Sequence, residues 1–366
     1  MSDPFGALAE EHPPQPPPQR TARRPQPTTW ALLIAFGAAF AVEALVSRDP
    51  MVENSLALFR LGALYTPAVQ DGDIWRLGSY AFLHIGWLHL LFNSYALWIL
   101  APQIETTYGS NATLGLFAAT AIAGGAASYA WSLHTGAEHL AAGASGGIFG
   151  LFGATVALYF RVRKALPEPV RHGIVRAIVI NLLINLAIAF KAPVDSAAHL
   201  GGMISGVLLG LVAPLVRGEP RPWHLAARVF LIGAAFALAA MEGAAVARAV
   251  RPHPRTLRGD GVTAQVPWLL VPARPGVAYL PGIVEAHLRR EDRRLSIPPG
   301  ADAVRLGDRT WVRQRSSSEG IDESVYEAAD GNGRLVIEFA CRDPLCQGAR
   351  GEDMVAQIAT TVRPLL

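Results

Sequence analysis

Charged side chains are scarce in this sequence. They make up 17% of its 366 residues, whereas an ordinary soluble domain has about 25%. The deficit is local, because long apolar runs alternate with short polar links between Trp30 and Ala247, while residues 1–28 and 250–366 are polar. The composition therefore divides the chain into an N-terminal tail, a membrane core and a soluble domain.

An excess of charge of either sign is also lacking. The chain has 32 basic and 29 acidic residues, a net charge of +3. It contains no aromatic-plus-basic module of the kind that binds nucleic acid. We therefore expect no nucleic-acid partner.

The first 28 residues lack the apolar residues that a folded core needs. They are rich in proline, and we expect residues 1–28 to form a disordered cytosolic tail. A cleaved signal peptide is the alternative, but it requires basic residues at the very start and a small-residue cleavage site after the apolar run. Here the basic residues begin only at Arg20, so the run from Trp30 to Val46 is better interpreted as a membrane helix.

Seven apolar runs are candidates for membrane-spanning helices, which need about 20 mostly apolar residues each. They are Trp30–Val46, Trp87–Ile104, Thr113–Leu133, Ser145–Phe160, Ile174–Phe190, Ala197–Val216 and Leu225–Ala247. We expect an all-α polytopic membrane bundle: a six-helix core over residues 29–217 and a seventh helix over residues 223–247. The long connection from Ser47 to Leu83 has apolar patches of its own and is expected to fold against the outer face of the bundle.

Basic residues favour an orientation with the N-terminus in the cytosol, because lysine and arginine stay preferentially on that side. Three basic clusters then share the inner side: before the first helix, between the fourth and fifth, and between the sixth and seventh. Lys191, Arg248, Arg251 and Arg255 fall on the outer side and count against this orientation. The orientation predicts an integral protein of a bacterial inner membrane, with residues 250–366 outside the cytosol.

Polar residues inside the apolar helices are few, and four of them lie at one level. Ser145 and His199 open the fourth and sixth helices, which both run inward from the outer face. His89 and Asn93 lie four apart near the outer start of the second helix, and so on one face. Intramembrane polar groups are costly and therefore mark functional candidates.

These four side chains have the chemistry of a serine nucleophile and its support. A serine hydroxyl needs a base such as an imidazole within hydrogen-bond reach. The start of a helix offers free N–H groups to an oxyanion, which Asn93 and His89 can supplement. Taken alone, the Gly143–Gly147 segment is more often a packing motif of small residues. Its G-x-S-x-G pattern is misleading as a hydrolase elbow, because that elbow needs a preceding strand and we expect none there.

The sequence resembles the rhomboid intramembrane serine proteases. The matching motifs, in chain order, are Trp75-Arg76, Phe82-Leu-His84 with His89-x-x-x-Asn93, Glu105-x-x-x-Gly109, Gly143-Ala-Ser145-Gly146, and Ala198-His199-x-x-Gly202-x-x-x-Gly206. Order, spacing and placement on apolar helices all agree over roughly residues 30–217.

The resemblance implies a serine endopeptidase with Ser145 as nucleophile and His199 as base, without a third acid. It assigns His89, Asn93 and the Ser145 backbone N–H to the oxyanion hole, and implies single-span membrane proteins in the lipid bilayer as substrates. Gly143, Gly146 and Gly202 support the site. Phe149 stands where many relatives have a tyrosine, and its ring can still stack on the histidine.

Other candidates carry less chemistry. Trp75 and Arg76 are expected to order the first loop rather than to touch substrate. Glu138-His139 lacks the H-E-x-x-H spacing of a zinc protease, so we expect no metal and no cofactor. Glu43 and Glu242 are expected near outer helix ends, within reach of water. Two rival classes remain: an inactive relative that binds membrane helices, and a transporter, which would show repeats and charged midplane residues.

Residues 250–366 are expected to form a small α+β domain. Strands over Ser324–Ala328 and Arg334–Phe339 flank a hairpin turn, Thr310–Arg315 adds a third strand, and a helix starts at Glu352-Asp353. The domain is expected to recruit substrate, gate access or bind an extracytoplasmic partner, and the sequence does not choose among these roles.

Cysteine is scarce in this sequence. Its only two cysteines, Cys341 and Cys346, lie in this domain on either side of an Asp343-Pro344 turn. Outside the cytosol such a pair is expected to oxidise to a disulfide. Two unpaired thiols and half of a metal site are the alternatives, although no second cysteine or histidine pair lies nearby to complete a zinc site.

Overall fold

The computed structural model describes most of the chain. The described residues are 26–47, 55–189, 195–259, 262–280, 284–295, 297, 301–318, 320–331, 333–342 and 347–364. The predicted tail lies outside them except for its last residues, of which Pro27 and Thr28 already belong to the first helix. The boundary predicted at residue 28 is therefore two residues too late.

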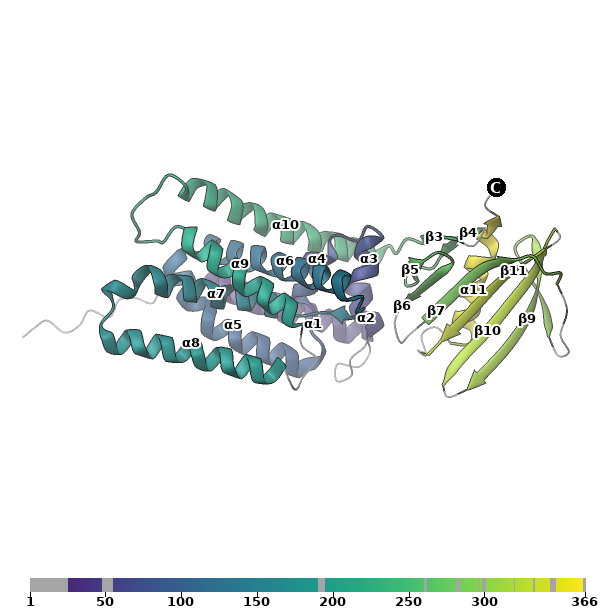
Figure 1. The fold of residues 1–366 in the computed structure, drawn as a ribbon, viewed down its shortest axis with the longest axis horizontal. Helices are drawn as coiled ribbons and strands as arrows, with labels where there is room; N and C mark the ends of the chain where they lie inside the picture. Colours follow the sequence, from purple (N-terminus) through teal and green to yellow (C-terminus); the bar gives the residue numbers. More distant parts are fainter. Residues whose placement is uncertain are drawn as a thin grey trace, which may run out of the picture.

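All seven apolar runs form helices in a bundle (Figure 1). They are α1 (Pro27–Ser47), α5 (Gly86–Tyr108), α6 (Ser110–Thr135), α7 (Ser145–Val162), α8 (Glu168–Ala189), α9 (Ser196–Val212) and α10 (His224–Val250). By length and hydropathy, α1, α6, α7 and α10 can each cross a membrane. Helix α5 qualifies only together with the bent segment before it, and α9 is shorter. The protein is an integral membrane protein, and the count of seven spans stays a prediction.

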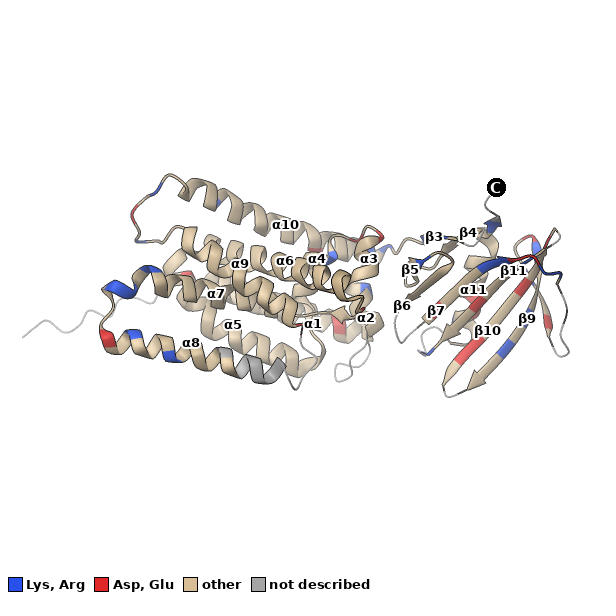
Figure 2. Ribbon diagram, viewed as in Figure 1, with Lys and Arg blue, Asp and Glu red and all other residues tan. Residues whose placement is uncertain are grey.

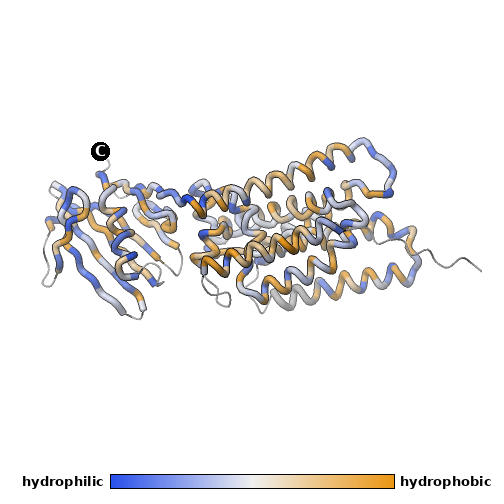
Figure 3. The backbone as a smooth tube through the Cα atoms, turned by 180° about the vertical axis from the view of Figure 1, so that it is seen from behind, coloured by the Kyte–Doolittle hydropathy of each residue, from blue (hydrophilic) through white to orange (hydrophobic). Residues whose placement is uncertain are grey.

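The helices of the bundle are rich in apolar residues, coloured orange in Figure 3, and many large ones are exposed. The large hydrophobic residues Leu45, Phe236 and Phe230, for example, are 79%, 73% and 56% exposed. Such a surface fits contact with lipid rather than water. The loop before α8 and the loop between α9 and α10 carry lysine and arginine at the end of the bundle away from the C-terminal domain (Figure 2).

The first loop folds against one end of the bundle, as expected. It contains α2 (Ser55–Leu61), β1 (Leu64–Tyr65), α3 (Thr66–Gln70), α4 (Arg76–Ser79) and the 3-10 turn η1 (Tyr80–Phe82). Strand β1 pairs with β2 (Leu140–Ala141), which lies just before α7. The expectation of no strand ahead of Ser145 is therefore wrong, although the strand has two residues and belongs to a two-stranded ribbon.

Glutamates anchor the amino-terminal helix at both ends. The Glu105 carboxylate accepts hydrogen bonds from the Thr28 and Thr29 N–H groups at 2.8 and 3.0 Å. It thus satisfies donors that the first turn of α1 leaves open. At the other end Glu43 is buried and accepts from the His84 N–H at 3.0 Å. The expectation that water reaches Glu43 is therefore wrong, whereas Glu242 is half-buried, with one buried carboxylate oxygen.

Helices α7 and α9 pack backbone to backbone through glycine. A Cβ built on Gly202 would lie 2.0 Å from the Gly146 carbonyl oxygen, and one on Gly206 would lie 2.0 Å from the Gly150 oxygen. Small residues allow membrane helices to approach this closely. The approach brings the first turns of α7 and α9 together.

The C-terminal region is rich in strands and includes one helix (Figure 1), and its assignment as an α+β domain stays a prediction. Its seven-stranded antiparallel sheet has the order β5-β6-β7-β11-β10-β9-β8, and a three-stranded sheet has the order β12-β4-β3. The strands are β3 (Arg255–Gly259), β4 (Val262–Val266), β5 (Val271–Arg274), β6 (Val277–Leu280), β7 (Val284–Glu291), β8 (Asp302–Leu306), β9 (Arg309–Ser318), β10 (Ile321–Asp330), β11 (Gly333–Cys341) and β12 (Arg363–Pro364).

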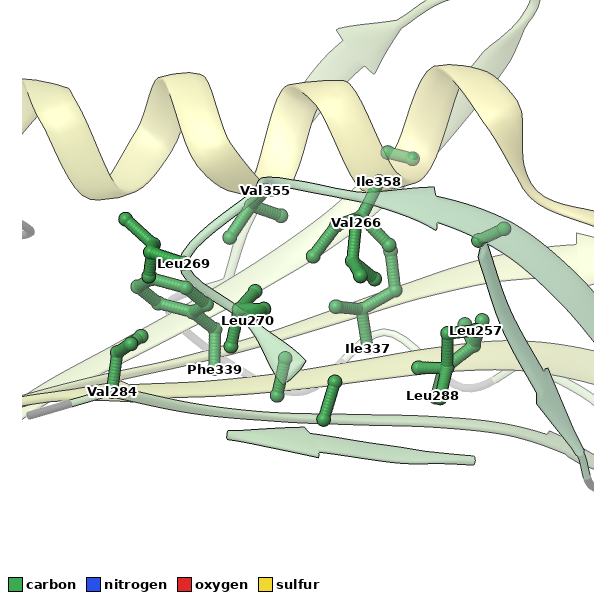
Figure 4. Packing of buried hydrophobic residues seen from close by; sticks show 14 of the residues in the cluster. Leu257, Val266, Leu269, Leu270, Val284, Leu288, Ile337, Phe339, Val355 and Ile358 are labelled. Atoms are coloured by element: carbon green, nitrogen blue, oxygen red, sulfur yellow. The ribbon is translucent and has the colours of Figure 1, made fainter. Parts of the chain in front are cut away.

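The predicted strands of this domain correspond to β9, β10 and β11. The predicted hairpin is present, with Asp330 paired to Gly333. Helix α11 (Ala349–Thr361) begins three residues before the predicted start and buries Val355 and Ile358 against the sheets (Figure 4). Strands β3 to β8 and β12 were not predicted.

The C-terminal domain contacts the first loop of the membrane core. The Trp268 ring stacks on Phe59, with centroids 6.0 Å apart at 10°. Arg255 on β3 forms ion pairs with Asp71 and Asp73, and Tyr279 on β6 donates to Glu138, which also accepts from Tyr65. Because Glu138 precedes α7, the domain lies at the end of the bundle that carries Ser145.

The charges around Asp73 favour its ionised form. Burial alone would raise the pKa of Asp73, but the guanidinium groups of Arg76 and Arg255 outweigh it and lower that pKa. The pairing with Arg255 is therefore intact at neutral pH. This contact attaches the soluble domain to the first loop.

Candidate active site

Ser145 and His199 meet at the start of two adjacent helices. Ser145 is the first residue of α7, and His199 lies in the first turn of α9. The Ser145 Oγ and the His199 Nε2 are 2.8 Å apart. This is hydrogen-bond distance for an imidazole that removes a proton from a serine hydroxyl.

Phe149 holds the histidine ring from one side. It lies one turn after Ser145 on α7, and its ring stacks on His199 with centroids 4.3 Å apart at 12°. A phenyl ring provides the same flat surface as a tyrosine ring. The departure from the tyrosine of many relatives thus leaves the stacking geometry in place.

The His89 side chain of α5 lies close to Ser145, and Asn93 lies one turn further along the same helix. A Cβ built on Gly143 would lie 2.9 Å from His89 Nε2 and 3.7 Å from Ser145 Oγ, so both atoms border the same space. His89 Nδ1 accepts from the Ile85 N–H at 3.2 Å, which leaves Nε2 to carry the ring proton. Asn93 is buried, and its Nδ2 has no hydrogen-bond partner among the residues that the structure describes. An unpaired buried amide is costly unless a ligand or substrate satisfies it.

Gly143 has a backbone that a side chain would strain. Its φ is +144°, and an added Cβ would lie 2.7 Å from the His89 ring. Its N–H donates to the Tyr80 carbonyl oxygen at 2.9 Å. Tyr80, which the sequence did not single out, also donates from its hydroxyl to the Ala121 carbonyl and lies against Gly146.

Trp75 and Arg76 lie within the first loop rather than beside Ser145. The Arg76 Nη1 donates to the carbonyl oxygens of Phe59 and Ala63, each at 2.8 Å. Its guanidinium lies over the rings of Phe59 and Trp75, at 4.1 and 4.5 Å. These contacts tie the turns of the loop together.

Asp195, Ser128 and His139 form a second polar group beside the site, which we call the Asp195 cluster. Asp195 is the N-cap of α9, four residues before His199. Its carboxylate accepts from Ser128 of α6 and lies 3.6 Å from the His139 Nε2. The sequence offered one signal for Asp195, an aspartate at the start of a helix. It offered none for its contacts with α6 and the loop.

Cofactor and disulfide chemistry add little to the site. Among the described ranges, no three histidine, cysteine, aspartate or glutamate side chains are grouped as metal ligands. Cys341 ends β11 and is buried. Cys346 lies outside the described residues, so the pairing of the two cysteines stays a prediction.

The fold and the site define a helical membrane protein with a serine and a histidine in contact at one end of its bundle. Residues 71–215 match the Rhomboid domain. This match confirms the resemblance to the rhomboid family seen in the motifs.

Several named relatives are rhomboid proteases. Rhomboid protease GluP of Bacillus subtilis is 33% identical over 182 residues, which are 50% of this chain and 34% of the relative. RHOMBOID-like protein 5 of Arabidopsis thaliana is 32% identical over 179 residues, 47% of this chain and 57% of the relative. Rhomboid protease AarA of Providencia stuartii is 28% identical over 212 residues, 53% of this chain and 75% of the relative. The chain thus spans about a third to three-fifths of the first two.

Proposed function

We propose that this protein is an intramembrane serine endopeptidase that cleaves transmembrane substrate proteins near the outer membrane face. The observation that carries the proposal is the 2.8 Å contact between Ser145 Oγ and His199 Nε2, at the starts of two apolar helices. An inactive rhomboid-like protein that binds membrane helices is the alternative. It has no need to keep this contact.

In the proposed reaction, His199 Nε2 takes the Ser145 proton as Oγ attacks the scissile carbonyl carbon. The carbonyl oxygen becomes an oxyanion that accepts hydrogen bonds from the Ser145 N–H, the Asn93 amide and His89. As the C–N bond breaks, His199 gives the proton to the leaving amine. Water then hydrolyses the acyl-enzyme with His199 again as the base. The unpaired Asn93 Nδ2 supports this assignment, because the oxyanion would supply its missing partner.

The position of Ser145 at one end of the bundle limits which substrates the proposed enzyme can cleave. Backbone groups of a helix in lipid are satisfied within the helix, so a scissile bond becomes accessible only where the helix unwinds. Ser145 opens α7, at the end of the bundle where the first loop and the C-terminal domain lie. We therefore propose single-span proteins that unwind at small residues near the outer face, with the N-terminus of the enzyme in the cytosol.

The decisive experiment compares purified wild-type protein in proteoliposomes with two serine variants. Wild type and Ser205→Ala should cleave a panel of single-span substrates and should react with a fluorophosphonate probe. Ser145→Ala should do neither. Ser205 is a matched control because its hydroxyl donates only to α9 carbonyls, at 2.8 and 2.9 Å. Equal cleavage by Ser145→Ala would reject the proposal, and an inert wild type would favour the inactive relative.

The proposal extends to the domain outside the core. Residues 250–366 would lie outside the cytosol, where Cys341 and Cys346 would pair as a disulfide. Cys346 alkylation before and after reduction in intact cells tests both points. Thiols labelled without reductant would contradict the disulfide.

A further inference from the structure

The Asp195 cluster joins three segments whose relative positions determine the distance between Ser145 and His199. Asp195 precedes α9, Ser128 lies on α6, and His139 lies in the loop that leads from α6 to Ser145. The Asp195 carboxylate accepts from the Ser128 Oγ at 2.5 Å and from the Ala198 N–H at 2.9 Å. It lies 3.6 Å from the His139 imidazole. The Asp195 carboxylate therefore contacts both segments beside the first turn of α9, which are helix α6 and the loop before α7.

The same residue also shapes the turn that carries the histidine. The Asp195 carbonyl oxygen accepts from the His199 N–H at 3.1 Å. Its side chain and main chain thus both fix the first turn of α9. A shift of Asp195 relative to the loop before Ser145 would move His199 relative to the nucleophile.

We propose that Asp195, with His139, is a positioning residue for the Ser145–His199 pair. By bridging α9 to α6 and to the loop before α7, its carboxylate holds His199 Nε2 within hydrogen-bond distance of Ser145 Oγ. The inference rests on the proposed function. It adds a charged contact to a pair that lacks a third acid.

The electrostatics of the cluster give the contact a pH dependence. The nearby Asp195 carboxylate raises the pKa of His139. Burial alone would raise the pKa of Asp195, but His139, Ser128 and the Ala198 N–H outweigh it and lower that pKa. The other groups facing Asp195 are His199 on α9 and Tyr80 of η1. Beside His139 the loop adds Glu138, which is bonded to Tyr65 and Tyr279.

The direction of the effect follows from the raised pKa of His139. The ion pair is fully formed below the ordinary histidine pKa of about 6.5 and weakens as pH rises through the raised value. Wild-type turnover should therefore fall on its alkaline side. The acid side, where His199 becomes protonated, should be common to all variants.

Two variants separate positioning from simple capping. Asp195→Asn keeps a good N-cap and a hydrogen-bond acceptor for Ser128, but removes the charge that pairs with His139. His139→Lys keeps a positive charge through the pH range in which a histidine of raised pKa loses its proton. Asp195→Asn should lower kcat roughly tenfold to a hundredfold with KM unchanged, since misplacement of about 1 Å costs on that order. His139→Lys should lose the alkaline decline.

The experiment measures kcat and KM against pH in proteoliposomes. Thermal unfolding of Asp195→Asn, His139→Gln and the double variant Asp195→Asn/His139→Gln is measured beside it. The coupling between Asp195 and His139 in thermal stability can be measured whether or not the protein cleaves a substrate. If wild type cleaves substrate and Asp195→Asn has the same kcat, the inference is overturned and the proposed function is left intact. A wild type that cleaves nothing, with the coupling present, would overturn the function and support the bridge alone. Zero coupling would overturn the bridge.

Discussion

The residues of the site are set by contacts as much as by their chemistry. Ser145 and His199 meet because their helices begin at the same level, which the apolar runs predicted. The stacking of Phe149 on His199, at 4.3 Å, follows from the one-turn spacing to Ser145. The bridge by Asp195 did not follow from the sequence, because Ser128 and His139 are 67 and 56 residues away in the chain.

Removing both members of the dyad tests whether they act as a unit. Ser145→Ala and His199→Ala should each abolish cleavage, and the double variant should lose no more than either single one, because members of a catalytic unit fail together. Initial rates on one single-span substrate, with far-ultraviolet circular dichroism to verify folding, measure this. Losses that multiply would contradict a shared role.

Asn93 offers a graded test of the oxyanion hole. Asn93→Ala should lower kcat toward the mild end of the roughly 10²–10³-fold loss that one donor causes, because His89 and the Ser145 N–H remain. Asn111→Ala is the control, since Asn111 is exposed at the start of α6. Unchanged turnover in well-folded Asn93→Ala protein would remove Asn93 from the mechanism.

At the scale of elements, glycine determines how closely α7 and α9 approach. The sequence predicted both helices and their small-residue pattern. It did not predict which glycines face each other, because that depends on the rotation of two helices about their axes. Likewise, the motif from Glu105 to Gly109 gave no sign that its carboxylate caps α1, since the cap comes from 76 residues away.

The close packing of α7 and α9 can be tested at one position. Gly202→Ala should destabilise the protein by about 1–3 kcal/mol, the usual range for overpacking, and should lower cleavage by separating Ser145 from His199. The new Cβ would lie 2.0 Å from the Gly146 oxygen. Gly233→Ala on α10 is the matched control, because nothing lies within 4 Å of its Cβ. Equal thermal stability of the two variants would contradict the packing argument.

At the scale of the whole molecule, the soluble domain rests on the membrane core. The sequence predicted its hairpin and helix from turn residues and an apolar stripe. It missed β3 to β8 and β12, of which all but β7 have five residues or fewer. The ion pairs from Arg255 to Asp71 and Asp73 join residues 184 and 182 positions apart in the chain, which no local pattern reveals.

Arg255 is the side chain to change in order to release the domain. Arg255→Ala should weaken docking by about 1.5–3 kcal/mol, the range for hydrogen bonds to charged groups, which is roughly ten- to a hundredfold in the docking equilibrium. Limited proteolysis between α10 and β3 measures it. Arg258 is exposed on the same strand, so Arg258→Ala should leave the rate of proteolysis between α10 and β3 unchanged.

The pH of that measurement matters, because Asp73 has a lowered pKa in the folded protein. Its contribution is fully present above the unfolded value of about 3.9 and is lost as pH falls through the lower, folded value. Docking should therefore be constant near neutral pH and weaken only in acid. Loosening at neutral pH in wild type would contradict this ion pair as the anchor.

The connection between the two parts has a consequence for competition. Only residues 251–254 separate α10 from β3, so even a fully extended connection reaches about 15 Å. An undocked domain therefore stays close to its own surface, at an effective concentration on the order of millimolar. A free protein that binds the same loop surface must overcome this local concentration. The soluble domain thus stays close to the loop before Ser145. A ligand that binds the domain itself is better placed to displace it from that loop than a protein that competes for the loop surface.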